Sequence, residues 1–290
     1  MTSYKGFFAE RLERLRSGVI TLLDSSKIGP SINDRSSGVI FIGASYPWGT
    51  LSPEAQVLQS TLYNEYKKLA EIGKSFLSDR ALPQNKDRFI RECDPILELT
   101  KQEHCTWYKN IGEAKKALNE SFNKQVEAVN SMHGKLGSGM VLIPDTNVII
   151  RSPHFHMYKV KEKCTILMQP TVLAELDSLK VFHRNENVRK KVSAAIKELK
   201  YLRSKGQIAD GVKVTENVTV CARAIEPRFD NKPSWLDPQN KDDRFLASCF
   251  EVSSEFPDSE ISILTLDFNV QNKAEISLLP FIDPEEQGII

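Results

Sequence analysis

The sequence predicts an α/β fold for its carboxyl-terminal half and a mainly α-helical region before it. Two observations lead to this prediction. Apolar residues recur at helical spacing along the first half of the chain. In the second half, short apolar runs typical of buried strands alternate with helical segments. The Gly-containing stretch HGKLGSG at 133–139 looks like a linker between them. We therefore expect a helical domain over 1–135 and an α/β domain over 140–290.

Three helical tracts are expected in the first domain, at 5–24, 52–77 and 86–133. Ser52 is a plausible helix cap, with Pro53 at the first helical position. The third tract is rich in good helix formers, and Pro95 is the expected break in it. The apolar run GVIFIGA, which ends at residue 44, is either a strand or a buried turn.

The second domain alternates strands and helices along the chain. Buried strands are expected at 141–150, 164–170 and 261–267, and an extended segment at 212–220. The expected helices follow between and after them, at 171–180, 187–204, 242–256 and 270–276. This order implies a central parallel sheet with helices on both faces.

Composition excludes some classes of protein but does not select a function. The formal net charge is +1, and 40% of the residues are hydrophobic. Neither half is basic enough to indicate nucleic-acid binding from composition alone. Five scattered cysteines without a paired motif favour a reducing compartment. The start has no apolar signal-like core and no run is long enough to cross a bilayer, so we expect a cytoplasmic protein without a membrane partner.

Acidic residues gather at the expected ligand-binding edge of the sheet. Asp145 and Asp267 close two of the strands, and Glu175 lies one turn into a helix. Asp242 and Asp243 open another helix. Carboxylates that meet there repel each other by roughly 3 kcal/mol per pair at ~5 Å and an effective dielectric near 20, so a cation must compensate. Ligands that are oxygen only favour Mg²⁺ or Mn²⁺ over zinc, and two such ions catalyse phosphodiester hydrolysis.

Four segments, in order, resemble the motifs of PIN-domain nucleases: IPDTNVII, PTVLAELDSLK, DDRFLAS and LTLDFNVQNKA. The resemblance covers about residues 140–283 and does not reach the helical region. It implies a PIN-like α/β/α sandwich with an acidic site that uses Mg²⁺ or Mn²⁺ to hydrolyse RNA.

Carried over to this sequence, the resemblance assigns four metal-binding acids: Asp145, Glu175, Asp243 and Asp267. Asp242 is a neighbouring candidate that is equally well explained as a helix cap. Three further polar residues match the supporting positions of the family: Asn147, Thr265 and Asn269.

Basic residues near the proposed site are candidates for binding the nucleic-acid backbone: Arg151, Arg184, Arg189, Lys190 and Lys191. The alternative is that they form a solvated helix face. Residues 206–240 are longer than the family minimum, and Trp235 within them either stacks on a base or packs. His154 and His156 suggest a metal pair, but with no further Cys or His at a useful spacing we favour surface or packing roles.

The leading functional hypothesis is an endoribonuclease that cuts single-stranded RNA by a two-metal mechanism. One alternative is a structure-specific DNA nuclease, although the sequence has no evident helical arch or helix-hairpin-helix motif. Another is an inactive scaffold that recruits partners through its helical half. That half is expected to regulate the nuclease, to form a homo-oligomer, or to bind an inhibitory or activating protein.

Overall fold

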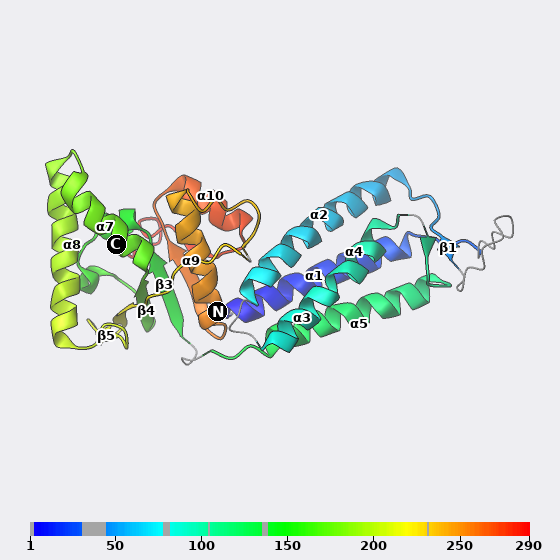
Figure 1. The fold of residues 1–290 in the computed structure, drawn as a ribbon, viewed down its shortest axis with the longest axis horizontal. Helices are drawn as coiled ribbons and strands as arrows, with labels where there is room; N and C mark the ends of the chain where they lie inside the picture. The colour runs from blue at the N-terminus through cyan, green and yellow to red at the C-terminus, as the bar shows by residue number, and fades with distance from the viewer. Residues whose placement is uncertain (1–2, 31–44, 78–81, 104, 135–138, 231) are drawn as a thin grey trace. The chain divides into compact units, whose positions relative to one another are not determined.

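The computed structural model describes residues 3–30, 45–77, 82–103, 105–134, 139–230 and 232–290. The apolar run at 38–44 and residues 135–138 of the expected linker lie outside the described residues. The chain divides into two compact units (Figure 1). One comprises Gly6–Met132, and the other comprises Met1–Lys5 together with His133–Ile290. Within the described residues, no helix has both the length and the apolar composition needed to cross a bilayer.

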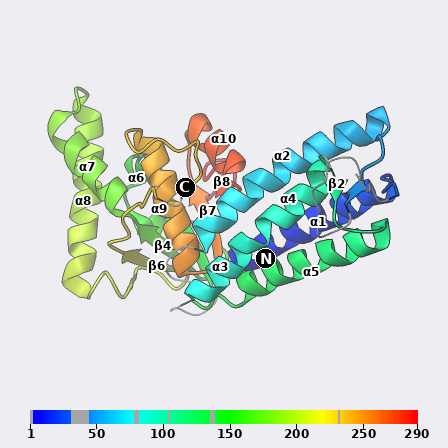
Figure 2. The ribbon, with the colours of Figure 1, turned by 45° about the vertical axis from the view of Figure 1, so that its right-hand side comes forward.

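The first unit, Gly6–Met132, is called the helical unit because it is built from helices that run alongside one another (Figures 1 and 2). They are α1 (Tyr4–Asp24), α2 (Pro53–Phe76), α3 (Pro83–Arg91), α4 (Cys93–Lys101) and α5 (Ile111–Asn130), accompanied by the short antiparallel strands β1 (Tyr46–Pro47) and β2 (Cys105–Thr106). The core contains the rings of Phe8, Phe76 and Phe89, all fully buried. Two buried polar side chains satisfy each other there, since Tyr66 and Gln125 are joined by a hydrogen bond of 2.8 Å.

The helices at 5–24 and 52–77 are confirmed, and the Ser52 side chain accepts a hydrogen bond from the Ala55 N–H. The single long tract expected over 86–133 is wrong, because that region contains α4 and α5 and most of α3. Gln102 takes a left-handed conformation with φ of 52° and ends α4. Pro95 does not break a helix, since it lies in the first turn of α4, where its missing N–H costs no intrahelical bond.

The second unit has a six-stranded sheet of order β5-β6-β4-β3-β7-β8. The strands are β3 (Met140–Pro144), β4 (Cys164–Met168), β5 (Val212–Lys213), β6 (Val218–Ala222), β7 (Glu260–Leu264) and β8 (Phe281–Ile282). All neighbouring pairs are parallel except β5 with β6. The expected α/β architecture is therefore confirmed.

The helices of this unit lie on both faces of the sheet (Figure 1). They are α6 (Thr146–Arg151), α7 (Pro170–Phe182), α8 (Glu186–Lys205), α9 (Lys241–Glu255) and α10 (Phe268–Ile276), with a 3₁₀ turn, η1, at Phe155–Met157. From β3 the chain moves outward through β4 to β6, and then returns to β7 on the other side of β3. Because crossovers are right-handed, this reversal sends α7 and α8 to one face and α9 and α10 to the other. The reversal also creates a crevice at the carboxyl ends of β3 and β7, where ligands bind in such sheets.

Some local expectations in this unit were wrong. The strand expected over 141–150 ends at Pro144, and the following residues form α6 because Asp145 caps a helix there. The extended segment expected at 212–220 is confirmed, but it consists of two antiparallel strands, β5 and β6, rather than one. The short strand β8 had no counterpart among the expected elements.

Candidate active site

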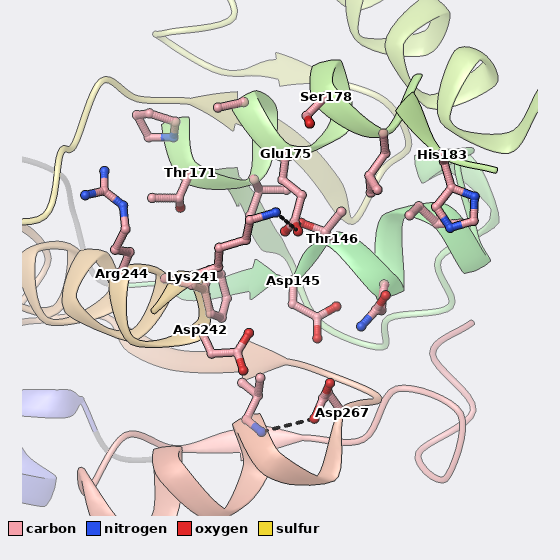
Figure 3. A pocket seen from close by; sticks show the side chains of 18 of the residues that line it. Asp145, Thr146, Thr171, Glu175, Ser178, His183, Lys241, Asp242, Arg244 and Asp267 are labelled. Atoms are coloured by element: carbon pink, nitrogen blue, oxygen red, sulfur yellow. Dashed lines mark hydrogen bonds and ion pairs between the residues drawn. The ribbon is translucent and has the colours of Figure 1, made fainter. Parts of the chain in front are cut away.

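A cavity of about 640 Å³ lies at the carboxyl ends of the central strands. Five of its lining residues are acids, and they come from different segments of the chain. Four lie at strand ends or on helices: Asp145 after β3, Glu175 on α7, Asp242 on α9 and Asp267 after β7. The fifth, Glu226, is an exposed residue in the segment after β6, and the sequence analysis did not single it out. Figure 3 shows Asp145, Asp242 and Asp267 turned toward a common space, with Glu175 beside Thr146 on its rim. Segments up to 122 residues apart in sequence, Asp145 to Asp267, thus meet at one place.

Asp145 is the most buried acid of the cavity, with 6% of its surface exposed. One carboxylate oxygen accepts a hydrogen bond of 2.8 Å from the Val148 N–H, and the other accepts one from the Thr265 hydroxyl. Burial raises the pKa of the Asp145 carboxyl to about 6, and the neighbouring charge of Asp267 adds to the rise. The fold therefore holds this carboxylate in a fixed orientation at an electrostatic cost.

Asp267 and Asp242 are joined through Asn269. The Asn269 N–H donates to Asp267 Oδ1 at 2.8 Å, which makes Asp267 the cap of α10. The Asn269 side-chain amide donates to Asp242 Oδ2 at 3.2 Å. One asparagine thus sets the positions of two acids that come from different helices.

Glu175 lies on α7, on the opposite rim of the cavity. Thr146 donates its hydroxyl to Glu175 Oε2 at 2.7 Å, and Lys241 Nζ lies 3.5 Å from Oε1. Among the described residues, no three of the cavity carboxylates have oxygens that all lie within 4.8 Å of one another. The acids therefore face one space without forming a compact group of three carboxylates, an arrangement that limits their mutual repulsion.

The structure differs from the sequence-based assignment at the third acid. Asp243 does not line the cavity. Its carboxylate is buried, accepts from the Asp237 N–H at 3.1 Å and pairs with Lys273 at 2.8 Å. Asp242 takes the place at the cavity that we expected for Asp243. The two side chains point about 100° apart around α9, so only one of them can face the cavity.

The three polar residues predicted to support the site lie beside its acids. Asn147 lines the cavity directly. Thr265 is fully buried beneath it, donating to Asp145 and accepting from the Asp267 N–H at 3.1 Å. Together with Asn269, Thr265 orients the carboxylates, which is the role that the resemblance implied.

Residues 142–284 match the family model described as the PIN domain. This half of the chain is a PIN domain. The match contains all five cavity acids and excludes the helical unit. A PIN domain is a nuclease-type fold, and such domains generally use divalent metal ions. A search of curated proteins found no sequence that matches the chain.

Of the five basic residues expected to bind nucleic acid, three are engaged by other groups of the chain and two are exposed. Arg151 pairs with Glu285 at 2.5 Å, and Lys190 pairs with Glu186 at 2.9 Å, in both cases on the surface. Arg189 donates to the His183 carbonyl and so holds the turn between α7 and α8. The remaining two, Arg184 and Lys191, are exposed. None of the five lines the acidic cavity.

Other polar residues of the PIN domain line the cavity without having been singled out in the sequence. Lys241 and Arg244 bring positive charge to its edge from α9, and Thr171 and His183 come from the two ends of α7. Lys241 and Arg244 flank the acidic pair in the sequence KDDR, and this position beside predicted metal ligands could have identified them as site residues. Trp235 donates to the Ser277 hydroxyl at 3.2 Å and is half-buried, which fits the packing alternative.

Proposed function

We propose that the PIN domain is a metal-dependent endonuclease that hydrolyses phosphodiester bonds of single-stranded RNA. The observation that carries the proposal is the convergence of Asp145, Glu175, Asp242 and Asp267 on one cavity. Four carboxylates facing one space, one of them buried with a raised pKa, favour the binding of cations.

The donor set fits hard divalent ions. The four acids offer only oxygen atoms, which suits Mg²⁺ or Mn²⁺ better than zinc. When bound, such ions supply Lewis-acid stabilisation of the phosphate and a water molecule of lowered pKa. The hydrogen bonds from Thr265, Thr146 and Asn269 hold the ligand oxygens in place before the substrate arrives.

The chain also supplies positive charge for the substrate. Lys241 and Arg244 lie at the edge of the cavity and are exposed, so they are placed to contact phosphates next to the scissile bond. Phe182 and Phe268 are 79% and 74% exposed, and each directly adjoins a cavity residue in sequence. Exposed aromatic rings beside a cationic edge suit unstacked bases, which supports a single-stranded substrate.

The primary test compares Asp242→Asn with Asp243→Asn in cleavage of single-stranded RNA with Mn²⁺. Loss of Asp242 is expected to lower kcat by about a hundredfold or more and to weaken Mn²⁺ binding in calorimetry. Loss of Asp243 breaks its pair with Lys273 and is expected to cost roughly 1–3 kcal/mol of stability while Mn²⁺ still binds.

The same experiment separates the alternatives. If Asp243→Asn abolished Mn²⁺ binding and Asp242→Asn retained it, the ligand would be Asp243, as the sequence first indicated. Preferred cleavage of a matched DNA would identify a DNA nuclease. Absence of divalent-ion binding to the unaltered protein would leave a scaffold without nuclease activity, and the proposal would fail.

A further inference from the structure

Two histidines and a glutamate meet on the surface of the second unit, away from the acidic cavity. One atom each of His154, His156 and Glu198 all lie within 4.8 Å of one another. The Nδ1 atom of His154 is 3.5 Å from Glu198 Oε2, and the two imidazole centroids are 5.6 Å apart. None of the three residues lines the acidic cavity.

The local fold explains why the two histidines lie together. Phe155, between them, is fully buried, and its ring lies against that of Tyr158 with centroids 5.7 Å apart. The short 3₁₀ turn η1 anchors this phenylalanine in the core. The flanking histidines are consequently left toward the surface, where His154 is partly exposed and His156 is exposed.

Glu198 comes from a different element, the middle of α8. It lies three residues after Ala195 and four before Leu202, both of which are buried, so it falls on the inner side of the helix. Only 16% of its side chain is exposed. A carboxylate in this largely covered position gains from a positive partner, and the residues facing it in the cluster are the two histidines.

The donor chemistry of this cluster differs from that of the acidic cavity. Two imidazole nitrogens and one carboxylate oxygen are ligands for borderline transition-metal ions, whereas Mg²⁺ prefers oxygen alone. Three protein ligands of this kind are a known set for Zn²⁺, with water in a fourth position. We propose that His154, His156 and Glu198 form a Zn²⁺-class site that is separate from the nuclease centre.

Such a site has a structural consequence. An ion shared by these residues joins the segment after α6 to the middle of α8. Asn147, on α6, lines the acidic cavity, and so does Val188, on α8. The proposed ion therefore fixes the spacing of two helices that contribute to the cavity wall, without itself entering the cavity. This inference does not depend on the proposed nuclease activity.

The test measures Zn²⁺ binding to the full chain by isothermal titration calorimetry. We expect one Zn²⁺ equivalent to be lost in His154→Ala, His156→Ala and Glu198→Gln. It is expected to persist in Asp242→Asn, which removes an acid of the cavity, and in His133→Ala, the matched control for loss of an exposed histidine. Co²⁺ provides a second readout, because its visible absorption reports nitrogen ligation.

Zn²⁺ is also expected to raise the melting temperature of the unaltered protein and of Asp242→Asn, but not that of His156→Ala. Since His156 is exposed, this variant is expected to fold, and circular dichroism checks that it does. If the protein bound no Zn²⁺, or if the equivalent disappeared in Asp242→Asn and remained in the histidine variants, the His154–Glu198 contact would be an ordinary surface pair. Either result overturns the proposal.

Discussion

Asp145 combines two properties that oppose each other. It is the most deeply placed acid of the cavity, and its burial raises the pKa of the carboxyl to about 6. The hydrogen bonds from Thr265 and the Val148 N–H favour the charged form but do not outweigh the loss of hydration. An acid whose pKa is higher in the folded state than in the unfolded state destabilises the fold once it ionises. The residue best placed to bind a cation is therefore a source of instability when no cation is bound.

The sign of this effect gives a prediction for stability. The contribution of Asp145 is fully favourable below the unfolded pKa of 3.8 and is lost as the pH rises through about 6. A shift of this size corresponds to about 3 kcal/mol. Asp145→Asn is therefore expected to raise the free energy of unfolding by about 2–3 kcal/mol at pH 8, and by only about 0.5 kcal/mol at pH 4, with a chelator present throughout.

The unfolding of the PIN domain has to be followed separately from that of the helical unit. Trp235 lies in the PIN domain, whereas Trp48 and Trp107 lie in the helical unit. Urea denaturation followed by Trp235 fluorescence, in a background with Trp48→Phe and Trp107→Phe, isolates the PIN domain. If the asparagine variant were no more stable at pH 8, the raised pKa of Asp145 would be contradicted.

At the scale of helices and strands, apolar periodicity and apolar runs in the sequence predicted most of the longer elements. Helices α1, α2, α7, α8 and α9 and the strands β4 and β7 appear close to their expected positions, whereas β3 ends earlier than expected. Boundaries set by single residues were missed, such as the left-handed Gln102 that ends α4. Strands of two residues, such as β8, carry too short a pattern to detect.

The site was predictable as a set of acids but not in its details. Asp242 and Asp243 are adjacent in the sequence, and which of them faces the cavity depends on how α9 is rotated against the sheet. That rotation is set by tertiary contacts, such as the pair between Asp243 and Lys273. Similarly, Glu198 joins His154 only because α8 packs against the segment after α6, a proximity that spacing along the chain does not reveal.

The close packing around Gly73 in the helical unit predicts that a larger residue there lowers stability. Gly73 is buried on α2, and a Cβ built there would lie 2.3 Å from Phe89 Cζ and 3.0 Å from Phe8 Cζ. Both rings are fully buried, so neither can move aside freely. Gly73→Ala is expected to destabilise the helical unit by about 1–3 kcal/mol, although alanine favours the helix by ~1 kcal/mol.

The control for this prediction is Gly139→Ala. A Cβ at Gly139 meets nothing within 4 Å, so that variant is expected to melt as the unaltered protein does. Thermal unfolding followed by circular dichroism at 222 nm compares the two variants, because helices α1 to α5 contribute a large share of that signal. An unchanged or raised melting temperature for Gly73→Ala would mean that the packing around α2 relaxes more easily than the structure indicates.

At the scale of the whole molecule, the chemistry is concentrated in one of two units. The PIN match covers 142–284, all five cavity acids lie within it, and the helical unit contributes none of them. We propose that the helical unit regulates the nuclease or binds a partner, including a second copy of the chain. Its own core of aromatic rings and its buried Tyr66–Gln125 pair make it a compact body that does not need the acidic site to hold together.

Because the cavity acids all lie in one unit, a bound ion is expected to slow amide hydrogen exchange in that unit only. The proposed ligands lie on four short segments, so Mn²⁺ is expected to slow amide hydrogen exchange at 143–148, 170–178, 240–246 and 264–271. Exchange within 6–132 is expected to stay unchanged, because no residue there contributes to the cavity. Mass spectrometry of peptides from the full chain, with and without Mn²⁺, measures both at once.

Asp242→Asn serves as the control, since the slowing should disappear when a ligand is removed. Slowed exchange in the helical unit as well would show that the two units respond together and that metal binding is not confined to the PIN domain. Unchanged exchange in all four segments would argue against their acids as the metal ligands.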